Sequence, residues 1–361
     1  MTIQKLIEGK SELTYSKKKA APIVLSTRIR LARNLTKQSF PGWSKPENRI
    51  EVFDLCEKVL GDLNTLKSPS TFKIDQLDDL EKKVLVERHL ISKELSQATL
   101  GAGVVVNKDQ SQVIMINEED HLRIQVMRSG YNFKSVWKTI DALDTEIEKR
   151  LQYAFSDDLG YLTACPTNLG TGMRASVMLH LPGLVISNQM DKVIRAVNQL
   201  GIAVRGIFGE GSDANGSIFQ ISNQQTLGED EKQIIKRLGK VLNNIIEQEE
   251  NCREKLLEKD DFKIKDKVGR AFGILRNAHM MNSNEAMNFL SLIRLGIDQG
   301  FFPEDSRPIV DRLFIECQPG HIQYAAMKEK TAEERDALRA EYLRNALREL
   351  PSPSYGINEN I

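Results

Sequence analysis

The chain has 361 residues, with 50 lysines and arginines against 50 aspartates and glutamates, so its formal charge at pH 7 is zero. This balance argues against a generally basic nucleic-acid-binding protein but allows a local arginine cluster that binds phosphates. No apolar run approaches the roughly 20 residues of a membrane span, and the N-terminal residues lack the apolar core of a secretory signal. The four cysteines are far apart and form no CxxC pair, which favours reduced thiols in a cytoplasmic protein over a metal site or disulfide framework.

Hydrophobic periodicity predicts the elements of the first two thirds of the chain. Residues 1–22 are a polar N-terminal segment. Helical spacing predicts helices at 46–66, 78–95, 135–151 and 191–200, the last ending before a glycine, as helices commonly do. Short β-rich runs predict strands at Gly103–Val106, Gln112–Ile116, 121–130, 204–208 and 217–222. A polar turn separates the first two strands, which we therefore expect to form a hairpin.

The character of the chain changes near residue 229, where a long amphipathic helical stripe begins. Most of the remaining sequence is helical in pattern. The last helix is predicted to start at Thr331, with Glu334 three residues later in a capping box. We expect an α+β fold: an antiparallel sheet flanked by helices over residues 23–254, then a helical C-terminal domain over residues 255–361.

The first candidate site is the run STRIR at residues 26–30. Its arginines, Arg28 and Arg30, alternate, so on a strand both would point to one face. Two guanidinium groups on one face suit a polyanion such as a nucleotide triphosphate. A solvated basic strand edge is the alternative for this run in isolation.

The second candidate is the run NEEDHLR at residues 117–123, directly after an apolar strand. Three consecutive acids beside a histidine and an arginine are unusual at the end of a buried strand. A carboxylate there could orient a guanidinium while Arg123 holds phosphate. An acidic surface turn is the alternative.

Two glycine-rich segments follow. The run CPTNLGTGMR at 165–174 combines Cys165 with glycines that allow close backbone approach, and a thiolate would be stabilised near a cationic substrate. The run RGIFGEGS at 205–212 offers another arginine, another glutamate and a loop suited to cover phosphates. The alternatives are a buried cysteine in a glycine-rich loop and an ordinary surface loop.

Taken together and in this order, SxRxR, NEEDHLR and CPTNLGT resemble the motifs of the phosphagen (guanidino) kinases, such as arginine and creatine kinases, over roughly residues 20–250. The resemblance implies ATP as phosphoryl donor, with Mg²⁺ held mainly through the nucleotide phosphates. It implies that Glu119 grips the substrate guanidinium and acts as catalytic base. Glu210 would be the second carboxylate on the guanidinium, and Cys165 would contact it as a thiolate.

The same resemblance implies a nucleotide site in which five arginines surround the phosphates and a histidine contacts the nucleotide. The residues that it implies for ATP binding are Ser26, Thr27, Arg28, Ile29, Arg30, His89, Arg123, Arg174, Ala175, Ser176, Val177, Met178, Arg205, Gly206, Ile207, Phe208, Gly209 and Glu210.

The sequence also departs from the metabolic kinases of this family. Those kinases carry a small helical domain before SxRxR. Because the motif starts at Ser26 here, we expect that domain to be missing and the opening to be wide enough for a protein side chain. Phe208 stands where metabolic arginine kinases carry another arginine, and Gln220 replaces an aspartate. These departures, with RASVMLHLP at 174–182 and the helical C-terminal part, resemble the bacterial members of the family that phosphorylate arginine in proteins.

The run RDALRA at residues 335–340 fits the RDxxRA element of the phosphoarginine-binding pocket in those bacterial members. The resemblance implies an allosteric phosphoarginine site formed by Arg335, Asp336, Arg339 and Ala340. The two arginines are four residues apart and would share a helix face. An ordinary charged helix surface is the alternative.

The expected function is ATP-dependent phosphorylation of arginine side chains in proteins, which marks or regulates them for stress response and proteolysis. The resemblance implies as partners protein substrates with exposed arginine, a zinc-binding activator, a stress-gene repressor and Clp protease components, and we expect a homo-oligomer. A kinase for a free guanidino metabolite such as arginine is the nearest alternative. A catalytically inactive adaptor that only binds phosphoarginine is an alternative of another class.

Overall fold

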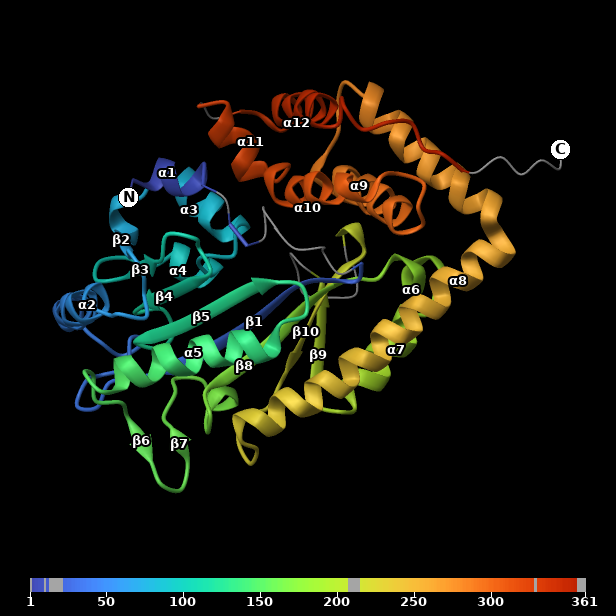
Figure 1. Ribbon diagram of the computed structural model, residues 1–361. Helices are drawn as coiled ribbons and strands as arrows, with labels where there is room; N and C mark the ends of the chain where they lie inside the picture. The colour runs from blue at the N-terminus through green and yellow to red at the C-terminus, as the bar shows by residue number, and fades with distance from the viewer. Residues whose placement is uncertain (1, 10, 13–21, 207–214, 328–329, 356–361) are drawn as a thin grey trace.

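The computed structural model describes residues 2–9, 11–12, 22–206, 215–327 and 330–355 (Figure 1). An eight-stranded antiparallel sheet in the order β2-β3-β4-β5-β1-β8-β10-β9 forms its centre. These strands are β1 (Val24–Arg33), β2 (Ser70–Lys73), β3 (Gly103–Val106), β4 (Gln112–Ile116), β5 (Leu122–Ser129), β8 (Met173–His180), β9 (Ile202–Gly206) and β10 (Ile218–Asn223). A separate two-stranded hairpin, β6 (Phe155–Ser156) with β7 (Gly160–Tyr161), projects from the sheet.

Helices surround this sheet, and those of the C-terminal part gather beyond one end of its strands (Figure 1). They are α1 (Ile3–Ile7), α2 (Pro46–Gly61), α3 (Asp79–Glu87), α4 (Lys93–Ser96), α5 (Phe133–Glu148), α6 (Pro182–Ile186), α7 (Met190–Asn198), α8 (Glu231–Asn277), α9 (Ser283–Asp298), α10 (Arg307–Glu316), α11 (Pro319–Ala325) and α12 (Ala332–Ala346). None of the helices in the described ranges is both long enough and apolar enough to cross a bilayer.

Alternation along β1 separates the core from the opposite face of the sheet. Ile29 and Leu31 are buried in the main apolar cluster, together with residues of α5 and α8 such as Ile140 and Leu242. Because side chains alternate along a strand, Arg28 and Arg30 face the other side of the sheet. The antiparallel sheet therefore has one face packed in the core and one face that carries these arginines.

Most predicted elements are confirmed with small shifts of their ends. The α+β class, the antiparallel sheet and the β3–β4 hairpin are present. The capping box at Thr331 and Glu334 also forms, and it starts α12. Residues 207 and 208, which the prediction placed in a strand, lie outside the described residues.

Three features differ from the predictions. The single helix expected at 78–95 is two helices, because His89 adopts a left-handed backbone (φ 57°) and Ser92 caps a new helix. The N-terminal segment contains the helix α1, whose Leu6 is fully buried. The central strand β8 was not predicted, and it is buried along nearly its whole length.

The 47-residue helix α8 connects the sheet to the C-terminal helices (Figure 1). Its backbone leaves helical geometry at Asp260 (φ −132°, ψ 32°). Its first half packs on the sheet through residues such as Leu238, and its second half packs with α9 through residues such as Val268. The domain boundary between residues 254 and 255 stays a prediction.

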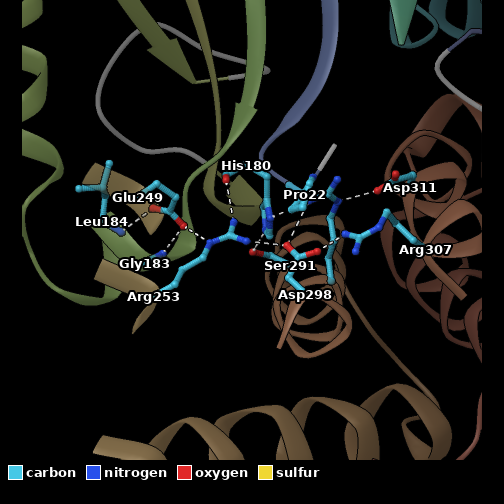
Figure 2. A network of polar contacts seen from close by, with 11 residues as sticks. Pro22, His180, Gly183, Leu184, Glu249, Arg253, Ser291, Asp298, Arg307 and Asp311 are labelled. Atoms are coloured by element: carbon cyan, nitrogen blue, oxygen red, sulfur yellow. Dashed lines mark hydrogen bonds and ion pairs between the residues drawn. The ribbon is translucent and has the colours of Figure 1, made fainter. Parts of the chain in front are cut away.

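A buried ion network joins these two parts, as Figure 2 shows. Arg253 of α8 donates to Asp298 Oδ2 of α9 (2.6 Å) and to the carbonyl of His180 at the end of β8 (3.1 Å). Arg294 of α9 contacts the His180 ring at Nδ1 (3.1 Å), and Arg307 also pairs with Asp298. The C-terminal helices are therefore tied directly to a strand of the sheet.

Replacing Asp298 with alanine is expected to destabilise the protein by about 3–5 kcal/mol, because it leaves three buried arginines without their shared carboxylate. Urea denaturation followed by circular dichroism measures this loss. Asp266→Ala is the control, because the Asp266–Arg270 pair is exposed and such pairs contribute under about 1 kcal/mol. Equal midpoints for the two variants would show that the network contributes little to stability.

Candidate active site

The side chains of four arginines come together because of strand register. Arg30 lies directly opposite Arg174 on the antiparallel pair β1–β8. On the other side of β1, Arg123 of β5 is paired with Ala32, two residues from Arg30 and therefore on the same face. Arg28 lies two residues before Arg30 and shares that face. Three neighbouring strands thus concentrate positive charge on one face of the sheet.

A cavity of about 500 Å³ opens over this face. Arg30, Arg123, Arg174 and Arg205 line it, and so do Glu119 and Cys165. The structure therefore brings together predicted residues from four separate motifs. Arg28 lies beside the cavity and donates to Gln220 Oε1 (2.6 Å), and Gln220 is itself a lining residue.

The arginines have mostly neutral partners among the described residues. Arg174 donates to Ser222 Oγ (3.1 Å), and the buried Nε of Arg30 has no hydrogen-bond partner in the described part of the chain. Burial, followed by repulsion from Arg174 and Arg123, lowers the pKa of Arg28 to about 10. The pKa of Arg30 also falls well below its usual value, mainly through burial. A bound polyanion would relieve this repulsion, as nucleotide phosphates do.

The three consecutive acids of NEEDHLR have three different positions. Glu118 pairs with Arg123 and accepts from Ser92. Glu119 is 43% exposed at its side chain and lies 3.4 Å from Arg123 Nη2, which makes it the acid with a free approach to the cavity. Burial, and then the neighbouring Asp120 carboxylate, raise the pKa of Glu119.

Asp120 connects the acidic loop to the cysteine loop. It is fully buried, and its Oδ1 accepts from Asn34 Nδ2 (2.6 Å) and from the backbone N–H of Ala164 (2.7 Å). Because Ala164 precedes Cys165, this contact fixes the thiol relative to Glu119. His121 is buried beside it, its Nδ1 accepts from a backbone N–H, and burial lowers its pKa to about 4.

Cys165 is the partly exposed cysteine of the four, all of which are free thiols. Its Sγ lies 3.0 Å from Thr167 Oγ1, at the start of a short 3₁₀ turn (Pro166–Asn168). Gly170 follows with φ 103°, and a Cβ there would lie 2.5 Å from the carbonyl oxygen of Thr226, so this close approach requires glycine. The buried cysteines differ: burial raises the pKa of Cys56 to about 12.

His89 lies close to the arginine cluster although it comes from the α3–α4 connection. Burial, and then Arg28 and Arg30, lower its pKa to about 3, so the ring is neutral at physiological pH. Its carbonyl accepts from Gln125 Nε2 of β5 (2.8 Å). The position agrees with the nucleotide contact that the sequence implied, which stays a prediction.

Several residues implied for ATP binding do not point into the cavity. Ile29, Ala175 and Val177 are buried in the core on the opposite face, and Met178 packs against the C-terminal helices. Ser26 and Thr27 are buried, and Thr27 donates to the carbonyl of Gly130 (2.7 Å). Ser176 faces Arg28. Gly206 ends β9, whereas Ile207, Phe208, Gly209 and Glu210 lie outside the described residues.

Sequence reasoning missed some residues that line the cavity. Arg49 of α2, together with Ser92 and Glu94 at the start of α4, contributes to the wall near Glu119. Arg49 stands in an ordinary amphipathic helix pattern, which gave no signal. The sequence did contain a signal for Ser92 as a helix start, because a serine before a new helical turn is a typical N-cap.

The RDxxRA residues have distinct surroundings on α12. Arg335 donates to the carbonyl of Lys330 (2.8 Å) and is partly exposed. Arg339 is only 1% exposed and donates to the carbonyls of Cys317 (2.7 Å) and Met281 (2.8 Å). It also donates to Asp336 (2.6 Å), and Ala340 packs in the C-terminal core. In this arrangement Arg339 holds neighbouring segments together.

Comparison with known proteins identifies the family. The profile of the ATP:guanido phosphotransferase C-terminal catalytic domain matches residues 51–252, and that of the protein-arginine kinase McsB C-terminal domain matches residues 261–357. The chain is 44% identical to the protein-arginine kinase of Halothermothrix orenii over 90% of its length and 93% of that protein. The chain belongs to the ATP:guanido phosphotransferase family, as one of its protein-arginine kinases. The protein-arginine kinase of Brevibacillus brevis is also 44% identical, over 91% of this chain and 93% of that protein.

Solved structures share the fold. The crystal structure of lombricine kinase has a TM-score of 0.57 and 25% identity over 70% of each chain. The duplicated taurocyamine kinase of Schistosoma mansoni, with bound transition state analog components, has a TM-score of 0.59 and 26% identity. That match covers 68% of this chain and 35% of the duplicated one. The predicted phosphagen-kinase fold is therefore confirmed.

Replacing Glu119 with glutamine is expected to lower kcat by about two to four orders of magnitude, because an amide cannot accept a guanidinium proton. ATP affinity should change little. Since the pKa of Glu119 is raised, the wild-type kcat/KM should decline on the acid side at a higher pH than an ordinary glutamate would give. Steady-state rates across pH measure both effects, with the exposed Glu51→Gln as control. A glutamine variant with the wild-type profile would exclude Glu119 as the base.

Proposed function

We propose that this protein-arginine kinase transfers the γ-phosphoryl group of ATP to arginine side chains of proteins within the described cavity. The observation that carries the proposal is the mixed lining of that cavity. Arginines whose partners among the described residues are mostly neutral line it together with Glu119 and Cys165. A triphosphate fits the arginines and a guanidinium fits the carboxylate and the thiol, so one cavity would bring the two reactants together.

The residues proposed for the phosphates are Arg28, Arg30, Arg123, Arg174 and Arg205. Glu119 would hold the substrate guanidinium in line with the γ-phosphorus, and Cys165 would add a second contact. The guanidinium pKa is very high, so the nitrogen needs a base before it can attack. As the new P–N bond forms, the bond from phosphorus to the β,γ-bridging oxygen breaks, and Glu119 takes the proton from nitrogen.

Mg²⁺ fits this site as the ion that the nucleotide carries. The described residues contain no group of three or more histidine, cysteine or carboxylate ligands that could hold a metal. The arginines that line the cavity instead suit a metal–nucleotide complex held through its phosphates. When bound, Mg²⁺ would neutralise part of the charge that moves to the leaving ADP, and the arginines would take the remainder.

A protein substrate is favoured over free arginine by the exposure of Glu119, whose carboxylate solvent reaches directly. The profile match of residues 261–357 to a domain named for the protein-arginine kinases also supports it. We further propose that the modified proteins are marked for stress response and proteolysis. A zinc-binding activator, a stress-gene repressor and Clp protease components would then be its partners, with the enzyme acting as a homo-oligomer.

Mass spectrometry tests the reaction. The full chain is incubated with ATP, Mg²⁺ and an unfolded arginine-rich protein, and in parallel with free arginine, and all steps stay non-acidic because acid hydrolyses the P–N bond. We expect about 80 Da added to protein arginines at a much higher kcat/KM than for free arginine. Faster phosphorylation of free arginine would support a metabolite kinase, and no product with either substrate would exclude transfer.

The RDxxRA residues are proposed as a phosphoarginine pocket in which Arg335 supplies the accessible cation. Arg335→Ala is expected to weaken phosphoarginine binding while folding and ATP affinity are retained. Arg339→Ala should instead destabilise the chain, by about 1–3 kcal/mol for each carbonyl left unpaired. Calorimetric titration with phosphoarginine and with ATP, beside thermal melts, separates the two, with the exposed Arg348→Ala as control. Unchanged phosphoarginine affinity in Arg335→Ala would make the motif an ordinary helix surface.

A further inference from the structure

A buried carboxylate joins the catalytic part to the C-terminal helices at a second place, away from the Figure 2 network. Glu87, in the last turn of α3, is 8% exposed. It accepts from the backbone N–H groups of Gly320 (2.7 Å) and His321 (3.0 Å), and from the His321 ring at Nδ1 (2.8 Å). One carboxylate thus receives three hydrogen bonds from the first turn of α11.

The contact is close enough to restrict the sequence on the α11 side. A Cβ on Gly320 would lie 2.7 Å from Glu87 Oε2, so any larger residue would displace the carboxylate from its present hydrogen bonds. Charge-assisted hydrogen bonds from two helix-terminal N–H groups to a carboxylate are among the stronger ones. The end of α3 is therefore held in a defined position by α11.

The chain leads directly from that end of α3 to the arginine cluster of the active site. His89 is two residues after Glu87, and its left-handed backbone (φ 57°) turns the chain toward the sheet. Its buried ring lies within electrostatic reach of Arg28 and Arg30, and its carbonyl accepts from Gln125 on β5. A shift at Glu87 would be carried to this ring by only two intervening peptide units.

The opposite partner, α11, is fixed within the C-terminal helices. The Cys317 carbonyl, just before α11, accepts from Arg339 Nε of α12 (2.7 Å). Gln318, the N-cap residue of α11, donates to the carbonyl of Phe314 in α10 (2.9 Å). Because α11 is held by contacts with α10 and α12, its position depends on how these helices pack. The end of α3 depends in turn on the position of α11, because Glu87 binds both.

We infer that Glu87 is a positioning residue through which α11 places His89 and so sets the affinity for ATP. The inference rests on the proposed function and on the prediction from the sequence that His89 contacts the nucleotide. The C-terminal helices would then influence nucleotide binding through Glu87 and His89, without themselves contacting the nucleotide. By reciprocity, ATP binding should also strengthen the attachment of α11 to α3.

The first experiment measures ATP affinity by calorimetry for the full chain and its variants. Glu87→Ala is expected to raise the Kd for ATP about fivefold or more, as coupled sites do, while KM for the protein substrate at saturating ATP stays unchanged. Glu87→Gln keeps one acceptor and should recover part of the affinity. The control is Asp79→Ala, which removes a fully exposed carboxylate from the same helix.

The second experiment is hydrogen exchange of residues 319–325 with and without ATP. In the wild type, ATP should slow exchange of the Gly320 and His321 amides, and in Glu87→Ala this ATP-dependent protection should be lost. If Glu87 only stabilised the fold, replacing it would not abolish the ATP-dependent protection of these amides. If Glu87→Ala does not fold, His321→Ala removes one of the three bonds, and a smaller rise in Kd in the same direction is expected.

The outcomes separate this inference from the proposed function. His89→Ala should raise the Kd for ATP more than Glu87→Ala does. If His89→Ala weakens ATP binding but folded Glu87→Ala and His321→Ala bind like the wild type, the inference is overturned and the proposed site stands. If His89→Ala binds ATP like the wild type, the His89 assignment is wrong and the inference fails with it.

Discussion

Repulsion among arginines on one face of β1, β5 and β8 is the constraint on which the arrangement of this enzyme depends. Arg30 and Arg174 face each other across paired strands, and burial deprives them of solvent screening. The opposite face of these strands is apolar and packed under α5 and α8. Core packing therefore provides the stability that offsets the repulsion among these arginines. A bound anion would reduce that repulsion.

The loops around the cavity show how such a charged site keeps a defined geometry. The three acids of NEEDHLR act differently, because Glu118 neutralises Arg123, Asp120 fixes the loop before Cys165, and Glu119 remains accessible. Neutral side chains such as Gln220 orient the arginines without cancelling their charge.

The C-terminal helices are attached to this core through buried polar contacts at two places, His180 at the end of β8 and Glu87 at the end of α3. Both attachments lie on elements that also carry or lead to residues of the active site. Buried hydrogen-bonded charges specify geometry strictly, because a displaced partner leaves an unsatisfied charge. The coupling that we infer between these helices and the proposed nucleotide site would run through such contacts.

The sequence by itself determined the local features. Alternation put Arg28 and Arg30 on one face, the Thr331–Glu334 pair capped α12, and the order of the three motifs SxRxR, NEEDHLR and CPTNLGT indicated the chemistry. These depend on backbone period and residue type, which neighbours in the chain set. The tertiary structure alone decided which acid faces the cavity, that Arg49 joins its wall, and that Arg339 is buried. Those outcomes depend on strand register and helix packing between residues far apart in the chain, which local patterns do not encode.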